Sequence, residues 1–296
     1  MIQRDVLILG GSGYVGQALM QALGKERVIG TQYAADVPGM LVFDARSETY
    51  AQLNIRDNPP RYAIILFAES QIENCFSNQY FAFELNVTAT IRIVDELMDA
   101  GVIPLFVSTD LVFDGEKGDY TELDHPEPLL EYGRQKLAVE RHLEDAGQPY
   151  LVVRLPKIVS ANITPRCVFG DWLDAILRGR EIRCSDDQFF SPIDVEDAAA
   201  GIVGLIDQNL LGLFHIGGPD RWCRADLFDA LACEVRRYKD VSTQMRRCSI
   251  RSFPEFSEIR PFDTSLQSDK SAKLLGLKYR SMEEVCAKAI QRVFDS

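Results

Sequence analysis

The chain has 296 residues, of which 46% are hydrophobic and 26% are charged, and its formal net charge is −12. This composition is typical of a folded globular protein and excludes a mainly disordered chain, a fibre and a coiled coil. The 32 basic residues against 44 acidic ones would repel nucleic acid and anionic lipid. No apolar run reaches the ~18 residues of a membrane helix, and the N-terminus lacks a signal-peptide pattern, so we expect a cytoplasmic protein.

The cysteines and histidines are scattered along the chain. An odd number of thiols without a C-x-x-C pair does not suit a disulfide framework, and no spacing typical of zinc ligands is present. We therefore expect reduced cysteines and no bound metal. The residues concerned are Cys75, Cys167, Cys184, Cys223, Cys233, Cys248, Cys286, His125, His142 and His215.

Short apolar runs alternate with helical patterns in the first half of the chain. Strands that are apolar throughout and separated by helices are typical of a parallel sheet covered on both faces. We therefore predict an α/β fold, a doubly wound parallel sheet of Rossmann type, with a dinucleotide-binding domain over residues 1–155. The predicted strands cover 6–9, 28–31, 41–44, 63–67, 102–107 and 150–153, and the predicted helices cover 14–23, 81–100 and 129–146.

The pattern changes after Leu155, where segments become shorter and prolines interrupt them. We predict that residues 156–296 form mainly a smaller C-terminal α/β substrate-binding cap on the carboxyl edge of the sheet. Some segments of this half are expected to return to the Rossmann core. The predicted helices cover 169–178, 195–207, 224–237 and 282–294.

A glycine-rich turn connects the first predicted strand to the first predicted helix. Glycines allow a tight turn and let the backbone approach a pyrophosphate, whose charge the free N–H groups at the helix start attract. The alternative is an ordinary glycine-rich turn. The position of this turn, between an N-terminal strand and a helix, favours a dinucleotide site. Its residues are Gly10, Gly11, Ser12, Gly13, Tyr14, Val15 and Gly16.

The choice between NAD and NADP depends on the end of the second predicted strand. NAD sites usually place an acid there for the ribose 2′-hydroxyl, whereas this chain has Gln32 and Tyr33. The missing acid favours NADP, although no Arg follows that would bind a 2′-phosphate. Asp44, at the end of the third predicted strand, either meets the adenine amino group or caps the next helix. Ala68, after the fourth strand, is also expected in the cofactor site.

A Y-x-x-x-K pair, Tyr132 and Lys136, lies in the helix predicted over 129–146. The i, i+4 spacing puts both side chains on one helical face. An ammonium ~4 Å from the phenol would lower the phenol pKa by about three units, towards working pH, which suits acid–base catalysis. The same spacing is common in purely structural helices, so the neighbouring residues decide its meaning.

Hydroxyl groups follow the strand that precedes this helix. Ser108 and Thr109 come at the carboxyl end of the strand predicted over 102–107, where parallel sheets bind ligands. Asn86, in the helix predicted over 81–100, either faces solvent or holds a water molecule for proton supply.

Together these residues resemble the extended short-chain dehydrogenase/reductase family. Residues 108–115 read S-T-D-L-V-F-D-G, which is similar to the S-T-D-Y-V-F-D-G signature of the dTDP-4-dehydrorhamnose reductases. The resemblance covers nearly the whole chain. It includes the late R-P-x-x-S-x-L element and the last strand of that family, at Arg260, Pro261, Ser265, Leu266, Lys270 and residues 214–218.

The resemblance implies a role for each candidate residue. Tyr132 would donate the proton to a carbonyl oxygen that receives hydride from nicotinamide. Lys136 would hold the nicotinamide ribose and lower the Tyr132 pKa. Thr109 would hydrogen-bond the reacting oxygen, with Ser108 beside it, and Asn86 would support a proton relay.

The chain departs from these reductases where they recognise the sugar. Leu111 replaces the signature tyrosine, and Lys157 replaces the tryptophan of their R-T-S-W-V-Y-G segment. A point charge thus replaces an aromatic platform, so we expect a sugar other than 4-dehydrorhamnose. Lys157 and Arg260 either bind a substrate diphosphate or balance the acidic surface.

Three functions stay open at this point. The first is NAD(P)-dependent reduction of a nucleotide-linked 4-keto sugar. The second is another reaction of the superfamily, such as sugar-nucleotide epimerisation; dehydration is disfavoured because Leu111 stands where dehydratases have a Glu. The third is a non-catalytic NADP-binding subunit resembling the regulatory subunit of methionine adenosyltransferase. By analogy with relatives, helices 81–100 and 129–146 are expected to pair in a homodimer.

Overall fold

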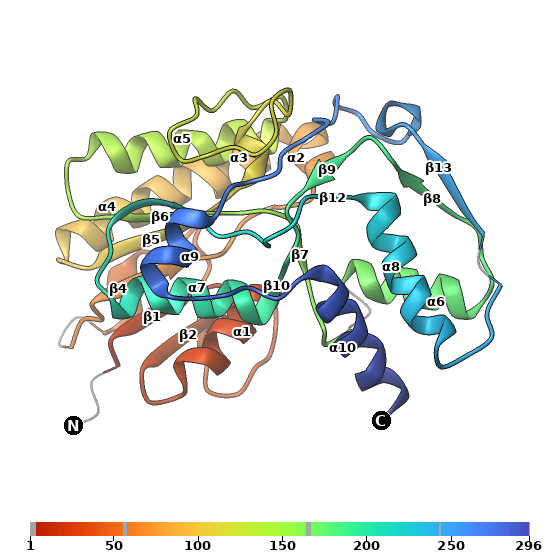
Figure 1. The fold of residues 1–296 in the computed structure, drawn as a ribbon. Helices are drawn as coiled ribbons and strands as arrows, with labels where there is room; N and C mark the ends of the chain where they lie inside the picture. The colour runs from red at the N-terminus through yellow and green to blue at the C-terminus, as the bar shows by residue number, and fades with distance from the viewer. Residues whose placement is uncertain (1–3, 56–57, 164–166, 243, 296) are drawn as a thin grey trace.

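The computed structural model describes residues 4–55, 58–163, 167–242 and 244–295, which form a sheet flanked by helices and a smaller unit beside it (Figure 1). The sheet has seven strands in the order β11-β6-β5-β4-β1-β2-β3, and every neighbouring pair is parallel. The predicted doubly wound sheet is therefore confirmed. Its strands are β1 (Val6–Leu9), β2 (Val28–Gln32), β3 (Leu41–Val42), β4 (Tyr62–Ile65), β5 (Ile103–Thr109), β6 (Leu151–Leu155) and β11 (Gly212–His215).

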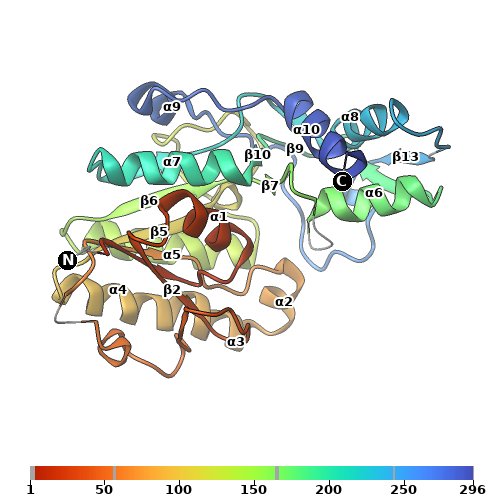
Figure 2. The same ribbon diagram turned by 90° about the horizontal axis from the view of Figure 1, so that it is seen from below.

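Helices cover both faces of this sheet, as Figure 2 shows. One face packs against α1 (Tyr14–Leu23) and α7 (Val195–Asp207), and the other against α4 (Thr90–Asp99) and α5 (Glu131–Asp145). Neighbouring strand residues alternate between the two cores, since Ile8 joins the first and Leu7 the second. This alternation explains why the strands are apolar throughout. Among the described helices, none is long and apolar enough to cross a membrane.

The segment predicted as one helix over 81–100 is helical but not uniform. It runs from α3 (Gln79–Phe83) through a π-helical stretch (Glu84–Ala89) into α4, without an extended residue between them. In the wider turn the hydroxyl of Thr90 donates to the carbonyl of Leu85, five residues earlier. A π-helical stretch inside a helix is often found at a functional site. This one contains Asn86.

The second half of the chain contributes to both parts of the molecule. The helices α6 (Val168–Leu177), α8 (Arg224–Arg236) and α10 (Met282–Phe294) share a separate hydrophobic core to the right of the sheet in Figure 1. In contrast, β11 completes the sheet, α7 covers it, and α9 (Asp269–Leu275) packs on α7. Short strand pairs lie between them: β7 (Ile158–Val159) with β10 (Ile193–Asp194), β9 (Phe189–Phe190) with β12 (Trp222–Cys223), and β8 (Ile182–Ser185) with β13 (Met245–Cys248).

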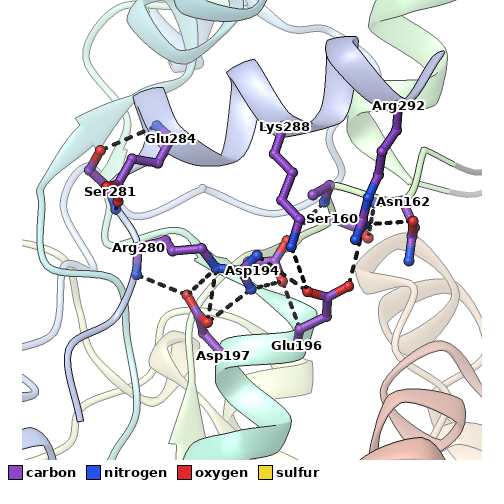
Figure 3. A network of polar contacts seen from close by, with 11 residues as sticks. Ser160, Asn162, Asp194, Glu196, Asp197, Arg280, Ser281, Glu284, Lys288 and Arg292 are labelled. Atoms are coloured by element: carbon purple, nitrogen blue, oxygen red, sulfur yellow. Dashed lines mark hydrogen bonds and ion pairs between the residues drawn. The ribbon is translucent and has the colours of Figure 1, made fainter. Parts of the chain in front are cut away.

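A network of charges connects α10 to α7 (Figure 3). Asp194 is fully buried and accepts hydrogen bonds from the amides of Ala161 and Glu196 and from the guanidinium of Arg280. Arg280 also binds Asp197 through two hydrogen bonds of its Nε and one of its Nη2. The connection between the two units therefore depends on a buried carboxylate with one cationic partner at hydrogen-bond distance.

We expect Arg280→Met to destabilise the protein by about 3 kcal/mol, because it leaves the Asp194 charge buried without its cation. Chemical denaturation measures this difference. The matched control is Arg180→Met, which removes an exposed ion pair with Asp174 and should change stability by less than about 1 kcal/mol. Equal effects of the two substitutions would contradict the prediction.

Candidate active site

The glycine turn is packed against the neighbouring strands. Gly10 has φ +95°, and a Cβ on it would lie 3.0 Å from the amide nitrogen of Phe67. A Cβ on Gly16 would lie 2.5 Å from the carbonyl oxygen of Gly10. The amide of Gly10 donates to the Thr31 hydroxyl at 3.0 Å. The turn thus requires glycine at these two positions.

The start of α1 is open to a ligand. Gly13 precedes the helix and contributes no side-chain cap, so no side chain satisfies the first N–H groups. Phosphate groups bind well at such a helix start. The structure therefore fits a dinucleotide whose pyrophosphate rests on the glycine turn.

A cavity of about 510 Å³ begins at this turn and extends across the carboxyl ends of β2, β3 and β4. Five of the residues predicted to bind the cofactor line it: Gly10, Ser12, Gly13, Asp44 and Ala68.

The other four predicted cofactor residues lie outside this lining. Gly11 packs on Gly30 of β2, with 3.3 Å between an added Cβ and the Gly30 Cα, and Gly16 packs within the turn. Val15 contacts the hydrophobic core, and Tyr14 is partly exposed and hydrogen-bonded to Ser160. Tyr14 thus connects the first helical turn to the segment after β7.

Arg46 also lines the cavity, and the sequence analysis missed it. Its guanidinium donates to the Tyr33 hydroxyl at 3.0 Å and lies 5.1 Å from the centre of the Phe81 ring. The carboxylate of Asp44 accepts hydrogen bonds from the amide and guanidinium of Arg46, which lower the Asp44 pKa. The sequence has no cation at the end of β2, but the fold brings Arg46 there from the segment after β3.

Helix α5, which carries Tyr132 and Lys136, packs closely against the turn after β5. A Cβ on Gly133 would lie 2.1 Å from the carbonyl oxygen of Leu111 and 2.9 Å from Cβ of Pro128. This close approach places the first turn of α5, with Tyr132, beside the carboxyl end of β5. The glycine between Tyr132 and Lys136 is therefore a requirement of the site that the motif did not reveal.

Tyr132 and Lys136 lie in poorly solvated surroundings. Burial raises the Tyr132 pKa above its ordinary value, and the nearby Cys75 and Asp110 add to the effect. Burial also lowers the Lys136 pKa to about 7, and the Lys136 Nζ lies 4.1 Å from the centre of the Phe106 ring.

The expected lowering of the Tyr132 pKa by Lys136 is therefore not found. Loss of water disfavours the phenolate, and Lys136 is not among the groups that shift the Tyr132 pKa. The chain alone thus holds a protonated phenol, which is the form that donates a proton.

The hydroxyls at the end of β5 differ in their partners. The Thr109 hydroxyl donates to Asp110 at 3.0 Å, and the Thr264 hydroxyl donates to the other oxygen of the same carboxylate at 2.7 Å. Burial raises the Asp110 pKa to about 6. The Ser108 hydroxyl is buried and has no hydrogen-bond partner among the described residues. In this arrangement Ser108 is the hydroxyl with a free proton to donate.

Asn86 connects α5 to the end of β4. Its side-chain oxygen accepts from the amide of Glu69, and its nitrogen donates to the Glu69 carbonyl and to Gln135. It is buried, so the alternative in which it faces solvent is wrong. These bonds use the oxygen and both N–H groups of the Asn86 side chain, so Asn86 ties α5 to the end of β4.

The two predicted substrate cations have different surroundings. Lys157 is exposed, two residues beyond β6, and its charge interacts with those of Arg224 and Asp110. Arg260 is mostly buried, forms an ion pair with Glu73 and stacks over the Phe256 ring. Of the two predicted cations, Lys157 is the one that forms no ion pair with any residue that the structure describes.

Comparison with known proteins gives a consistent result. A family model described as the RmlD substrate binding domain matches residues 4–294. The probable low-salt glycan biosynthesis reductase of Haloferax volcanii is 27% identical over 238 residues, which cover 77% of this chain and 79% of that protein. Methionine adenosyltransferase 2 subunit beta of Xenopus tropicalis is 25% identical over 285 residues, covering 92% and 82%.

The solved structures extend this similarity to the fold. The dTDP-4-dehydrorhamnose reductase of Bacillus anthracis, in complex with NADP, superposes with a TM-score of 0.82 at 22% identity. The superposition covers 98% of this chain and 99% of that one. The two structures therefore share both the sheet and the smaller unit beside it.

Proposed function

This chain belongs to the RmlD substrate binding domain family, within the extended short-chain dehydrogenase/reductases, and we propose that it reduces a 4-keto sugar carried by a nucleotide. One observation carries the proposal: the tyrosine–lysine pair of α5 lies beside the hydroxyls that end β5. Tyr132 is close enough to Asp110 for the carboxylate to raise the phenol pKa, and Asp110 accepts the Thr109 hydrogen bond. The cavity of the glycine turn opens at the same edge of the sheet.

The reaction adds a hydride and a proton to a carbonyl group and leaves an alcohol. A reduced nicotinamide cofactor held at the glycine turn would supply the hydride and be oxidised in doing so. Tyr132 donates its phenolic proton to the carbonyl oxygen, and Ser108 donates a hydrogen bond to the same oxygen. This transfer leaves a negative charge on Tyr132. Because Tyr132 and Lys136 share one face of the helix, that charge favours the ammonium form of Lys136. Lys136 is buried and Tyr132 is half-buried, so water has limited access to this proton transfer.

NADP is the proposed cofactor, because Arg46 supplies the cation that a 2′-phosphate needs. Its guanidinium carbon lies 5.5 Å from the centre of the Tyr33 ring and 5.1 Å from that of the Phe81 ring, and all three residues line the cavity. No acidic residue follows directly after β2 to repel a phosphate there. Nε and Nη2 of Arg46 already donate to Asp44, so a phosphate would be held by Nη1 and by the charge of the guanidinium.

We expect Arg46→Ala to raise the Kd of NADPH at least ten-fold and to leave the Kd of NADH nearly unchanged. Fluorescence titration of each cofactor measures both values. The matched control is Arg61→Ala, since Arg61 also lies over a tyrosine ring, that of Tyr62, but at the start of β4 on the opposite edge of the sheet. An equal loss for both cofactors would show that Arg46 does not read the 2′-phosphate.

The proposed reaction is tested with the purified protein, NADPH and a panel of nucleotide-linked 4-keto sugars. The expected result is loss of NADPH absorbance with at least one of them. Conversion of a nucleotide sugar without net loss of reduced cofactor would instead identify an epimerase. No conversion with any member of the panel would count against both enzymatic functions.

A second candidate is a non-catalytic subunit, which the similarity to the Xenopus tropicalis protein favours. A stable complex with a partner enzyme, together with absent turnover, would support it. The homodimer through helices 81–100 and 129–146 stays a prediction. Measuring the mass of the protein in solution tests whether the protein is a dimer.

A further inference from the structure

The first turn of α5, which contains Tyr132, receives no cap from the residue that precedes it. That residue is Leu130, and its side chain makes no hydrogen bond to the helix. Helix ends fray unless their free N–H groups find an acceptor. Tyr132 is the second residue of α5, so it lies in the turn that would fray. The position of the proposed proton donor therefore depends on what binds this turn.

The carboxylate of Glu258 caps this turn from a distant part of the chain. Its Oε1 accepts a hydrogen bond from the amide of Glu131, the first residue of α5, at 2.8 Å. The same oxygen accepts from the Arg134 guanidinium at 3.1 Å. The Glu258 side chain is only 7% exposed, so water competes little with these bonds. Its negative charge also lies at the positive end of the helix dipole, where it stabilises the turn.

Glu258 reaches α5 on a strap, residues 253–262, which returns from β13 of the smaller unit towards the sheet (Figure 1). The strap is anchored on both sides of Glu258 by one carboxylate, that of Glu73. The amide of Ser257 donates to Glu73 at 3.0 Å, and Arg260 forms an ion pair with it. These anchors limit the movement of the strap, so they hold the Glu258 carboxylate at the start of α5.

The second oxygen of this carboxylate, Oε2, is buried and has no hydrogen-bond partner among the described residues. In the part of the chain that the structure describes, the hydrogen bonds of the Glu258 side chain thus all go to the start of α5. We propose that Glu258 is a positioning residue for the reduction, because its carboxylate holds the first turn of α5 and thereby the phenol of Tyr132. This inference rests on the proposed function and adds a residue to it.

Steady-state kinetics with an accepted keto sugar tests this role. We expect Glu258→Ala to lower kcat by about ten-fold or more, since a small misplacement of a reacting group is enough for such a loss. The KM of the sugar should change far less than kcat. The Kd of NADPH should stay unchanged, because Glu258 does not line the cofactor cavity. Glu258→Gln keeps an oxygen that accepts from the Glu131 amide, so it should restore most of the lost turnover.

Glu96→Ala is the matched control. Glu96 makes the same kind of contacts far along the chain from α5: its carboxylate accepts from the amide of Tyr50, which begins a short 3-10 helix, and forms an ion pair with Arg92. We expect Glu96→Ala and Glu258→Ala to lower the midpoint of denaturant unfolding by similar amounts. Only Glu258→Ala should lower kcat.

A second measurement does not depend on turnover. NMR of isotope-labelled tyrosine rings reports each phenol, and the signal of Tyr132 is the one that Tyr132→Phe removes. We expect Glu258→Ala to shift or broaden this signal, and Glu96→Ala to leave it in place. Unchanged NADPH binding shows that each variant is folded. If Glu258→Ala does not fold, Glu258→Asp takes its place in both measurements, because it keeps the charge but shortens the reach to α5.

Two results would overturn the inference and leave the reductase function intact. A Tyr132 signal that Glu258→Ala leaves in place would show that Glu258 does not position the phenol. An equal loss of kcat in Glu96→Ala would show that Glu258 acts only through the stability of the fold. Absence of turnover by the wild-type protein would instead remove the reductase function, and the NMR comparison would still decide whether Glu258 holds Tyr132 in place.

Discussion

Tyr132→Phe should reduce the turnover of any accepted keto sugar by about 10³-fold, because it removes the proton that the carbonyl oxygen must receive. The phenol is the group of α5 that reaches the end of β5, and its raised pKa keeps it protonated until the carbonyl oxygen gains charge. The substitution should lower kcat and leave the Kd of NADPH unchanged, since it does not alter the glycine turn or the cavity at β2 and β3. Stopped-flow measurement of NADPH oxidation separates the two quantities.

The matched control for this substitution is Tyr80→Phe. Tyr80 is 80% exposed on α3 and should lose its hydroxyl without effect. Wild-type turnover by Tyr132→Phe would exclude this phenol as the proton donor. In the regulatory-subunit alternative, Tyr132→Phe would leave the effect on a partner enzyme intact.

Gly133→Ala should reduce both stability and activity, although alanine is the better helix former by about 1 kcal/mol. The added Cβ would lie 2.1 Å from the Leu111 carbonyl oxygen, which belongs to the backbone and cannot turn aside. Helix α5 must then move away from the turn after β5 and carry Tyr132 and Lys136 with it. We expect a net loss of about 2 kcal/mol in stability, within the range seen for overpacked cores, and at least a 100-fold loss in kcat.

Gly204→Ala in α7 is the control for this prediction. The nearest atom to its added Cβ is Cδ2 of Leu275, at 3.1 Å, which is the end of a flexible side chain. The free energy of unfolding of the Gly204→Ala variant, measured with denaturant, should therefore stay close to that of the wild type. If Gly133→Ala behaved in the same way, the contact between α5 and the Leu111 carbonyl would not position the catalytic pair.

The sheet was predictable because its physical cause is local. A strand buried on both faces must be apolar at every position, and β1 and β4 show this in the sequence. The bounds of α1, α7 and α10 were also predicted correctly, since each shows apolar residues at helical spacing. In contrast, the π-helical stretch around Asn86 has no signal of this kind. It depends on contacts with Glu69 and Gln135, which are distant in the sequence.

The site was predictable only where a motif brings its residues together. The spacing of Tyr132 and Lys136 predicts that they share one face of the helix. It does not predict the burial that shifts their two pKa values. Arg46 was missed because it belongs to no motif. It reaches the cavity through the order of the strands, and a single sequence does not contain that information in any local pattern.

The ion network of Asp194 has a consequence for biosynthesis. Asp194 precedes α7 and caps its first turn, but the cation that neutralises this residue is Arg280, 86 residues further along the chain. A growing chain that contains α7 but not yet Arg280 must either keep the Asp194 carboxylate in water or bury its charge without this cation. The first strands can assemble earlier, but the junction between the sheet and the smaller unit can be completed only after residue 280 has been synthesised.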